Sequence, residues 1–303
     1  MMSKQFNNQP LISIIMNCYN GEAYLYECIE SVLSQTYNNW EIIFWDNRSE
    51  DKSAEIFKSY NDKRFKYFFA DQHSSLYKAR NLAVKKSNGE LLAFIDTDDL
   101  WEKNKLELQV ALFDDPKVSL VYSNYWIIKN KLENKKIFTK TKSPSGFIYE
   151  KLLDKYNVGI VTAIFRKKII NHFPKAFDER FSVIGDFDFF LKLSQSHYFH
   201  YIDAPLAYYR IHEKNFSSIY KEKEMEEFNI WANENRNNIS FKKLRKIKKM
   251  ISLRKLLHFK FNKDYNNCYK ILLENYKSIS IIKMLIIVLT PLYILKKISK
   301  FHI

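Results

Sequence analysis

Three carboxylates follow an apolar run at residues 91–95, which leads directly into Asp96-Thr97-Asp98-Asp99. In an extended chain, residues i and i+2 project to the same side, so Asp96 and Asp98 should converge. Two close carboxylates repel each other unless they share a proton or a cation. A hard divalent ion satisfies both with oxygen ligands, and it can also stabilise the charge of a leaving diphosphate. Alternatively, the segment is a solvated turn in which Asp99 caps the next helix.

A second group of polar side chains lies where the first two expected strands end. Asn20 follows the first of these strands, and Asp46 and Asn47 follow the second. Such groups can bond ribose hydroxyls and a base edge, because parallel α/β sheets bind ligands beyond the carboxyl ends of their strands. Alternatively, residues 46–51 form an Asx-type turn that caps the next helix. Arg80, near the start of a helix, can pair with phosphate or base oxygens or form only a surface ion pair.

Asp186 is the candidate general base. It follows Gly185 at the start of an expected helix over 186–194. Free N–H groups and the helix dipole keep a carboxylate ionised at this position, so it is ready to accept a proton. Asp188 is the second candidate for the base. The alternative is that Asp186 is a plain N-cap and that the apolar side chains of this helix belong to the core.

The elements that must position these residues alternate between strand and helix patterns. The spacing predicts strands at 11–16, 41–45, 65–69, 91–95 and 119–123, and helices at 24–34, 53–60, 77–87 and 103–113. This alternation predicts an α/β fold with a mostly parallel central sheet and helices on both faces. The middle region is less regular, with a hairpin or loop at 130–142 and strands at 161–165 and 204–210.

The scarcity of glycine excludes several classes of protein. Only 5 of the 303 residues are glycine, and no two of them lie within six residues of each other. The chain therefore has no G-x-G-x-x-G dinucleotide loop, no P-loop and no G-x-S-x-G nucleophile elbow. The three cysteines form no C-x-x-C pair, which disfavours a disulfide scaffold and favours a reducing compartment. The polar first ten residues carry no secretory signal pattern.

With these motifs in place, residues 10–218 resemble the family 2 glycosyltransferases of the GT-A fold. The matching segments are 14–22, 45–51, Ala79–Asn81 with Gly89–Glu90 and Phe94–Asp99, Gly185–Leu193, and Tyr209–His212 with Asn215 and Ser217. The resemblance implies a Rossmann-like nucleotide-binding sandwich in a domain over 1–218. In that domain, 10–123 would be the nucleotide-sugar half and 124–218 the acceptor half.

The resemblance also implies an activity, which is inverting transfer of a hexosyl or hexosaminyl group in cell-surface polysaccharide synthesis. The donor would be a nucleoside-diphosphate sugar, with a UDP-sugar expected first, and the acceptor a hydroxyl of a glycan or a lipid-linked saccharide. The implied donor contacts are Asn20, Glu22, Asp46, Asn47, Arg80, Asp96 and Arg210. The implied ligands of Mn²⁺ or Mg²⁺ are Asp98, Asp96 and His212, and Asp186 would be the general base.

Two positions depart from the family pattern. The family often has Asp-Asp-Gly-Ser after the second strand, whereas this chain has Asp46-Asn47-Arg48-Ser49. Contact with the base therefore falls to Asp46 alone or to the amide of Asn47. Before the late helix, the family's usual Glu-Asp pair is Gly-Asp here, so its second acid is kept as Asp186.

The positive charge is concentrated in the C-terminal fifth of the chain. The net charge is +15, and residues 241–303 hold 16 Lys and Arg but only two acidic residues. We expect 219–303 to be a basic helical extension that attaches to an anionic membrane surface through 241–303. Residues 284–295 are uncharged, but twelve residues interrupted by Pro291 are too short to span a bilayer. They would lie in the membrane interface or pack on the body of the protein.

The expected location is therefore cytoplasmic, at the inner face of the cytoplasmic membrane. Nucleic acid is not an expected partner, because the basic segment shows no binding motif and no interleaved stacking aromatics. A non-catalytic sugar-nucleotide-binding or membrane scaffold protein is the main alternative. A sugar-nucleotide pyrophosphorylase is disfavoured, because residues 16–21 cannot supply a glycine-rich phosphate loop.

Overall fold

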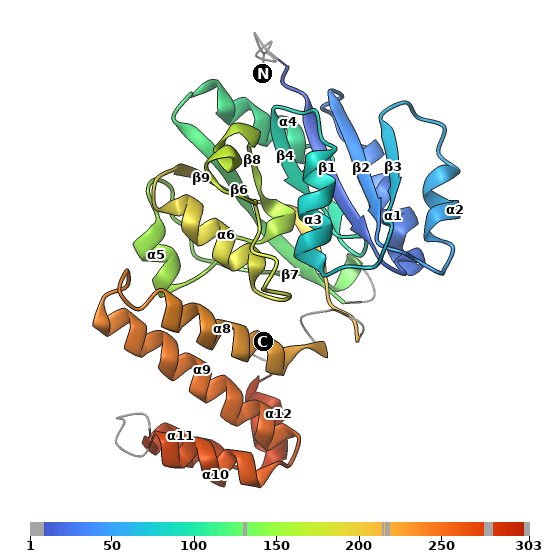
Figure 1. Cartoon of the computed structure of the whole chain (residues 1–303). Coiled ribbons are helices and arrows are strands. Elements are labelled where there is room, and N and C mark those ends of the chain that lie inside the picture. Colours follow the sequence, from blue (N-terminus) through green and yellow to red (C-terminus); the bar gives the residue numbers. More distant parts are fainter. Residues whose placement is uncertain (1–8, 130–131, 214, 216–218, 276–280, 300–303) are drawn as a thin grey trace. The chain divides into compact units, whose positions relative to one another are not determined.

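The computed structural model describes residues 9–129, 132–213, 215, 219–275 and 281–299. It divides into two compact units, Met1–Glu213 and Lys214–Ile303 (Figure 1). Ser217, one of the residues of the family resemblance, lies outside the described residues.

The first unit alternates strands and helices in its N-terminal half, as the sequence predicts. Its first elements are β1 (Ile12–Cys18), α1 (Glu22–Leu33), β2 (Trp40–Asp46), α2 (Ser53–Lys58), β3 (Phe65–Phe69), α3 (Leu76–Lys85), β4 (Leu91–Phe94), β5 (Leu100–Trp101) and α4 (Lys105–Val110). They continue with η1 (Ala111–Asp114), β6 (Val118–Ile128), η2 (Leu132–Asn134), β7 (Lys136–Ile137), α5 (Tyr149–Asp154), η3 (Ile160–Thr162), β8 (Ile164–Arg166), η4 (Lys167–His172), α6 (Gly185–Ser194) and β9 (Tyr198–Arg210).

Within the described residues, nine strands form one sheet in the order β3-β2-β1-β4-β8-β6-β9-β5, with β7 paired to β6. The half made of β3, β2, β1 and β4 is wholly parallel. The α/β fold class is therefore confirmed, and the apolar β4 is a buried interior strand, as predicted. In the other half, β8 is antiparallel to both of its neighbours, whereas β6 and β9 are parallel.

Several elements of the second half differ from the sequence prediction. The last strand begins at Tyr198 rather than at 204, and it continues through Pro205 because the register of β6 and β9 shifts there. Proline is tolerated in a sheet at such an irregularity. The strand predicted at 161–165 is a 3₁₀ turn followed by β8. The short β5 and α5 were not predicted from the sequence, because neither is long enough to show a period.

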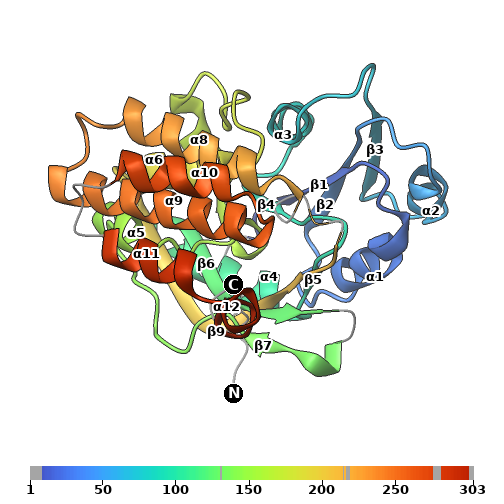
Figure 2. The same ribbon diagram turned by 90° about the horizontal axis from the view of Figure 1, so that it is seen from below.

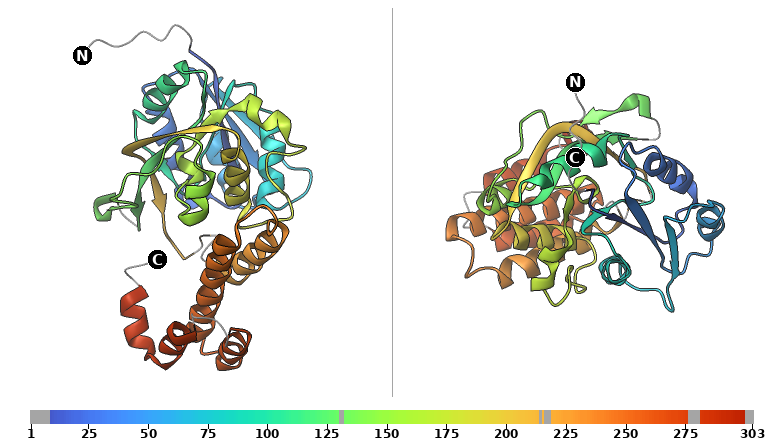
Figure 3. Two further views of the ribbon diagram at one scale, coloured as in Figure 1. Left: turned by 90° about the vertical axis from the view of Figure 1, so that its left-hand side faces the viewer. Right: turned by 90° about the horizontal axis from the view of Figure 1, so that it is seen from above.

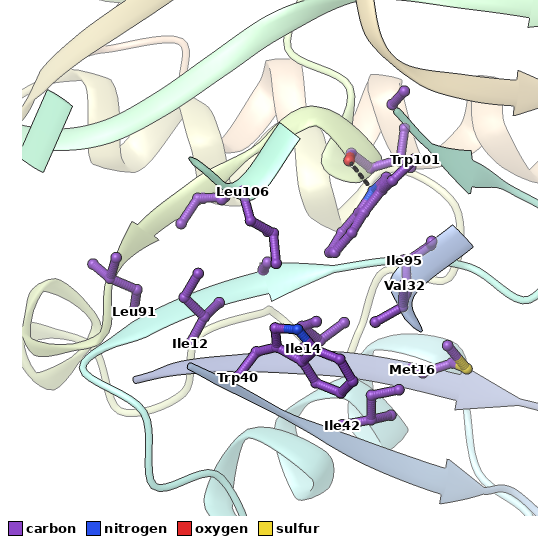
Figure 4. Close-up of a cluster of buried hydrophobic side chains, with 14 of the residues drawn as sticks. Ile12, Ile14, Met16, Val32, Trp40, Ile42, Leu91, Ile95, Trp101 and Leu106 are labelled. Carbon is purple, nitrogen blue, oxygen red and sulfur yellow. Dashed lines mark hydrogen bonds between the residues drawn. The ribbon is translucent and has the colours of Figure 1, made fainter. Parts of the chain in front are cut away.

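Helices cover both faces of the sheet. On one face, α1 and α4 pack on β1 and β2 around a core that includes Ile14, Trp40 and Leu106 (Figures 2 and 4). At the edge of this core, the indole N–H of Trp101 donates to the carbonyl oxygen of Val161 at 2.9 Å. Burial of such side chains contributes about 1.5–3 kcal/mol each.

On the opposite face lie α3 and α6 (Figure 2), which share an aromatic cluster. The ring centroids of Tyr77 on α3 and Phe177 lie 5.4 Å apart, and those of Phe177 and Phe189 on α6 lie 4.7 Å apart. Phe177 also meets Phe94 at the end of β4 in an edge-to-face contact. This cluster holds the starts of α3 and α6 beside the end of β4, which is where the candidate site lies.

The second unit is helical in its described residues. It comprises α8 (Lys221–Glu234), α9 (Phe241–Phe261), α10 (Tyr265–Glu274), α11 (Ile281–Leu289) and α12 (Leu292–Ser299). The long α9 lies beside α8 (orange in Figure 3), and Arg254 and His258 on α9 pair with Glu224 and Glu222. The uncharged stretch 284–295 breaks at Thr290-Pro291 between α11 and α12. Within the described ranges, no helix combines the length and the apolarity that a membrane crossing requires.

Candidate active site

The acidic residues after β4 form two close pairs with basic side chains. The Arg80 guanidinium donates to Asp96 Oδ1 at 2.6 Å, and the imidazole of His212 lies 2.9 Å from Asp98 Oδ2. Arg80 is almost fully buried, whereas the carboxylates of Asp96 and Asp98 are 36% and 25% exposed. The two carboxylates are therefore held from the protein side and open to a ligand from the solvent side.

Asp99 and Arg210 lock the end of β9 to this acidic loop. Asp99 Oδ1 accepts from the backbone N–H of Arg210 at 2.9 Å, and the Arg210 Nε donates to the carbonyl oxygen of Asp98 at 2.8 Å. The same guanidinium donates to Glu27 on α1 at 2.7 Å. Asp99 thus does not cap a helix, since α4 begins only at Lys105. Its bond to Arg210 places His212, two residues further on, against Asp98.

Negative charge accumulates in the loop. Burial and the neighbouring Asp96 carboxylate raise the pKa of Asp98, although the hydrogen bond with His212 opposes this shift. Burial together with Asp98 and Asp96 raises the pKa of Asp99 well above its usual value. Protons are bound more tightly here than in water because the carboxylates repel one another. A cation would relieve the same repulsion.

Asp186 lies in the first turn of α6, next to the aromatic cluster. Its Oδ1 accepts from the Tyr77 hydroxyl at 3.1 Å and from the backbone N–H of Phe187 at 2.9 Å. The carbonyl oxygen of Val183 lies 2.9 Å from the same hydroxyl and shares its one proton with Asp186. The N-cap of α6 is Ile184, so Asp186 is not a plain N-cap. Burial raises the pKa of Asp186, and the charge of Arg80 limits the rise.

Gly185 allows this arrangement because the Tyr77 ring lies against its Cα. A Cβ at this position would be 2.6–2.7 Å from three ring carbons of Tyr77. Any other residue at 185 would displace either the ring or the first turn of α6. Gly185 therefore sets the distance at which the Tyr77 hydroxyl reaches Asp186.

Arg80 connects the acidic loop with Asp186. Burial disfavours the charge on Arg80, but the carboxylates of Asp96 and Asp186 raise its pKa above the usual value. The Nε of Arg80 is buried and has no hydrogen-bond partner among the described residues. The structure thus pairs Arg80 with Asp96 and Asp98 with His212, and the charge of Arg80 acts on Asp186. The roles of these residues in binding and catalysis stay predictions.

The polar residues after β1 and β2 contact each other's loops. Asn20 Oδ1 accepts from the Glu50 N–H at 2.8 Å, and Glu22 Oε2 accepts from the Lys52 N–H at 2.9 Å. Asn20 has a left-handed backbone with φ 54°, which asparagine tolerates better than most residues. Both side chains remain exposed at the carboxyl edge of the sheet. Their predicted contact with a donor stays a prediction.

Asp46 and Asn47 are buried in the same network. Asp46 is fully buried, and its two oxygens accept from the Tyr67 hydroxyl and the Ser49 N–H, both at 2.7 Å. The alternative Asx-type turn at 46–51 is therefore present. Asn47 donates to the Ser74 carbonyl oxygen at 2.7 Å and accepts from its N–H at 3.1 Å. These side chains position the loops that would flank a base.

Two predicted donor contacts need correction on these grounds. Asp46 has no exposed surface, so its carboxylate does not reach a ligand in this conformation. The Arg210 side chain is 2% exposed and is bonded to Glu27 and Asp98. Sequence reasoning assigned both residues to the nucleotide because they stand at the right strand ends. In the structure, both position other parts of the site.

Asp98 and His212 fit a divalent cation better than the predicted set of three ligands does. Asp96 is paired with Arg80, and within the described residues no group of three His, Cys, Asp or Glu side chains converges for a metal. A carboxylate oxygen and an imidazole nitrogen 2.9 Å apart can share one ion such as Mn²⁺. The remaining ligands would then be oxygens of a bound diphosphate and water.

Sequence reasoning missed Tyr77, Glu27 and the role of Asp99. Tyr77 begins a helix and reads as a core aromatic, and Glu27 reads as a surface position of α1. No local pattern shows that they meet Asp186 and Arg210, because each contact spans more than 100 residues of chain. Asp99 was visible in the sequence, but its partner on β9 was not.

Comparisons with known proteins show the family of this chain and its fold. A family model described as "Glycosyl transferase family 2" matches residues 13–173. An Escherichia coli protein named "UDP-Glc:alpha-D-GlcNAc-diphosphoundecaprenol beta-1,3-glucosyltransferase WfgD" is 35% identical over 184 residues, which cover 61% of this chain and 69% of that protein.

Solved structures share the fold. S. aureus TarS aligns with a TM-score of 0.63 at 20% identity over 87% of this chain, which spans about half (46%) of the TarS chain. TarS 1–349 in complex with UDP aligns with a TM-score of 0.59 at 19% identity, over 88% of this chain and 91% of that one. The mannosyltransferase PcManGT from Pyrobaculum calidifontis, in complex with GDP-Man and Mn²⁺, aligns at 0.60 and 14% identity, over 90% and 76%.

Proposed function

Because this chain belongs to glycosyl transferase family 2, we propose that it transfers a sugar, with inversion, from a nucleoside-diphosphate sugar to an acceptor hydroxyl. It is a glycosyltransferase with the GT-A fold. The acceptor in this proposal is a glycan or a lipid-linked saccharide in bacterial surface-glycan synthesis. The names of WfgD and of the TarS complex support UDP as the nucleotide and a lipid diphosphate on the acceptor.

The observation that carries the proposal is the position of Asp186 relative to Arg80 and the acidic loop. Arg80 pairs with Asp96 at 2.6 Å, and its positive charge also acts on the Asp186 carboxylate. A donor whose ribose and diphosphate lie at Asp96 and Asp98 would present its sugar on the Asp186 side. Inversion requires the base and the diphosphate contacts to face opposite sides of the anomeric carbon, and the proposal assigns these roles to Asp186 and to the acidic loop.

In the proposed reaction, the acceptor hydroxyl oxygen bonds to the anomeric carbon as the bond from that carbon to the diphosphate oxygen breaks. The electron pair leaves with the nucleoside diphosphate. Asp186 takes the hydroxyl proton, and its raised pKa makes it a stronger base than an ordinary carboxylate. Tyr77 orients the carboxylate by its hydroxyl bond.

Asp98 and His212 would hold the divalent ion, Mn²⁺ or Mg²⁺, in this proposal. When bound, the ion supplies Lewis-acid stabilisation of the departing diphosphate. Asp96 and Asn20 would contact the ribose, and Asn47 is the remaining candidate near the base edge. Arg80 would stay paired with Asp96. Its unbonded Nε provides a further donor on the same side.

The test compares Asp186→Asn with Asp188→Asn. Asp188 is in the same turn of α6, but it is buried and its carboxylate pairs with Lys192 at 2.6 Å. We expect Asp186→Asn to lower single-turnover sugar transfer by about 10²–10⁴-fold, which is the contribution of a general base. It should leave UDP-sugar binding intact. Asp188→Asn should retain transfer.

The donor is identified in the same set of assays. Thermal unfolding is followed with UDP, GDP, dTDP and CMP and their sugars, each with Mn²⁺ and with EDTA. A ligand at 100 times its Kd stabilises by about 2.7 kcal/mol. If the Asp186→Asn variant transfers sugar as fast as wild type, Asp186 is not the general base. Product formation by wild type refutes a non-catalytic scaffold.

We also propose that the second unit attaches the enzyme to the inner face of the cytoplasmic membrane. The exposed apolar residues of α11 follow helical spacing along one stripe, namely Ile282, Leu285, Ile286 and Leu289. Such a stripe next to a strongly basic helix is typical of interfacial binding to anionic lipid. A lipid-linked acceptor would then be reached at the membrane surface.

A further inference from the structure

One face of α1 lies against the segment that carries His212, a predicted ligand of the divalent ion. Arg210 ends β9, and the strand pairing continues one residue further, since the backbone N–H of Ile211 donates to the carbonyl oxygen of Ile128 at 2.8 Å. In an extended chain, residues i and i+2 project to the same side. The side chains of Arg210 and His212 therefore point the same way, and both reach Tyr24 on α1.

The ring of Tyr24 contacts the imidazole of His212. The two ring centroids lie 5.1 Å apart, with an angle of 38° between the ring planes. Among the described residues, the hydroxyl of Tyr24 takes part in no hydrogen bond, so the contact is made by the ring. An aromatic ring packed at this distance restricts the rotation of the imidazole. The Nε2 of that imidazole therefore keeps its place 2.9 Å from Asp98 Oδ2.

The same Tyr24 ring supports Arg210. The guanidinium carbon lies 4.5 Å from the ring centroid, which is within the range of a cation–π interaction. Glu27 lies three residues after Tyr24, on the same face of α1, and it accepts from this guanidinium at 2.7 Å. Arg210 in turn donates to the carbonyl oxygen of Asp98 at 2.8 Å. Tyr24 therefore contacts the imidazole directly and the acidic loop through Arg210.

The orientation of the ligands decides how strongly a cation is held. A carboxylate and an imidazole bind one ion only when both donor atoms are aimed at the same point. A side chain that is free to rotate loses conformational entropy when it binds, and this loss weakens the binding. Side chains that orient a ligand from behind contribute about 10–100-fold to metal affinity for this reason. The Tyr24 ring has this position behind the imidazole of His212.

We propose that Tyr24 is a positioning residue for the divalent cation, and that its ring holds the imidazole of His212 where Nε2 and Asp98 Oδ2 bind one ion. The inference rests on the transferase function proposed above, and it adds a residue of α1 that is not itself a metal ligand. Tyr24 acts by ring packing. Tyr24→Phe should therefore bind the ion as wild type does, and Tyr24→Leu should not.

The test measures Mn²⁺ binding to the full chain, with and without UDP, by electron paramagnetic resonance of the free ion. The variants are Tyr24→Leu and Tyr24→Phe. Tyr26→Leu is the matched control, because Tyr26 lies on the same helix, is 62% exposed and has its ring centroid 6.2 Å from that of Tyr60. Asp98→Asn identifies the binding that belongs to the predicted centre. Circular dichroism checks that each variant is folded.

We expect Tyr24→Leu to weaken Mn²⁺ binding by about 10–100-fold, and Tyr24→Phe and Tyr26→Leu to leave it unchanged. UDP binding in EDTA should be the same in all three variants, because the loss concerns the ion and not the nucleotide. Sugar transfer by Tyr24→Leu should recover as the Mn²⁺ concentration is raised. A merely structural role of Tyr24 would lower the unfolding midpoint and leave the Mn²⁺ affinity as it is.

Equal Mn²⁺ affinity in wild type and in folded Tyr24→Leu would overturn the role of Tyr24. An equal loss of affinity in Tyr24→Phe and Tyr24→Leu would also overturn it, because the first of these keeps the ring. If Tyr24→Leu does not fold, Tyr24→Met takes its place with the same expected loss. Wild type without any Mn²⁺ binding that Asp98→Asn removes would overturn the inference as well.

Failure of the proposed function has a different signature. In that case wild type would bind Mn²⁺, and the variants would show the expected affinities, but no donor sugar would be transferred to an acceptor. Conversely, transfer by wild type together with an unchanged Mn²⁺ affinity in Tyr24→Leu would reject only the role of Tyr24. The two proposals are therefore distinguished.

Discussion

Asp186 combines burial with a nearby positive charge and two hydrogen-bond donors, and together these set its proton affinity. Burial raises the pKa of Asp186, whereas Arg80 and the bonds from Phe187 N–H and the Tyr77 hydroxyl oppose the rise. A base held in this way accepts a proton more readily than a solvated carboxylate, and the charge of Arg80 favours its ionised form. The pKa of Asp186 is therefore set by its neighbours in the fold rather than by its position in the sequence.

A stability measurement follows from the direction of this shift. Since the folded pKa lies above the unfolded value, the stability that Asp186 contributes is present below the unfolded pKa and is lost as pH rises through the folded pKa. Asp186→Asn should therefore raise the unfolding midpoint at pH 7–8, and the gain should vanish as pH falls toward about 4. Thermal unfolding across this range checks it. An equal gain at all pH values would contradict the raised pKa.

Tyr77→Phe tests whether the hydroxyl orients and tunes Asp186. The ring stays in the aromatic cluster, so we expect a loss of about 1 kcal/mol of stability for the hydrogen bond that the single hydroxyl proton shares between Asp186 and Val183. Removal of a bond that favours the carboxylate should raise the pKa of Asp186 further. The acid limb of the kcat/KM profile should then move to higher pH.

Tyr67→Phe is the matched control for this prediction, because its hydroxyl is bonded to Asp46 instead. It should leave the acid limb of the profile in place. If Tyr77→Phe lowers kcat/KM equally at every pH and the acid limb of the profile stays in place, Tyr77 has only a structural role.

At the scale of elements, the start of α6 depends on one close approach. In most helices, replacing glycine by alanine stabilises by about 0.5–1 kcal/mol. At Gly185 the new Cβ would be 2.6 Å from the Tyr77 ring, and overpacking of this kind costs about 1–3 kcal/mol. The cost of overpacking exceeds the gain from helix propensity, so Gly185→Ala should lower the free energy of unfolding of the protein. It should also reduce turnover, because the ring and α6 must separate.

Gly159→Ala serves as the control for Gly185→Ala. Its nearest neighbour would be the Tyr125 ring at 3.4 Å, which is ordinary contact. Urea unfolding should show a clearly lower free energy of unfolding for Gly185→Ala and little change for Gly159→Ala. A stabilised Gly185→Ala would mean that the ring moves aside freely.

The sequence predicts the elements of the parallel half well because each one has a clear period. Apolar strands such as 41–45 and the helix at 24–34 need no distant partner to be recognised, and β2 and α1 match them within a few residues. The predicted site residues Asp96, Asp98 and Asp186 stand at strand or helix ends for the same reason. Arg210 was misassigned because burial against Glu27 is set by packing across the fold.

At the scale of the whole molecule, the chain combines a transferase unit with a basic helical one. The sequence shows the charge asymmetry and the interruption at Pro291, and the structure adds that two separate helices, α11 and α12, lie on either side of it. Composition predicts a partner of opposite charge. Only the structure of α11 shows which of its apolar side chains are exposed on one face of the helix.

Leu285→Glu/Ile286→Glu tests membrane attachment. We expect binding to phosphatidylglycerol vesicles to fall at least tenfold, since burial of a leucine or isoleucine contributes about 1.5–3 kcal/mol. Leu108→Glu on α4 of the first unit, also an exposed leucine, is the control and should bind as wild type does. Vesicle sedimentation at low and high salt measures both variants. If the double variant sediments with the vesicles as wild type does, α11 does not contribute to membrane binding.

The close packing of Gly185 and Tyr77 also restricts how this protein can change over generations. A side chain at 185 is accommodated only after the ring at 77 becomes smaller, and that first step removes the hydroxyl that Asp186 accepts from. Each single substitution is therefore selected against before the compensating one arises. The pair should be inherited together, and a lineage that alters it must first find another donor for its base.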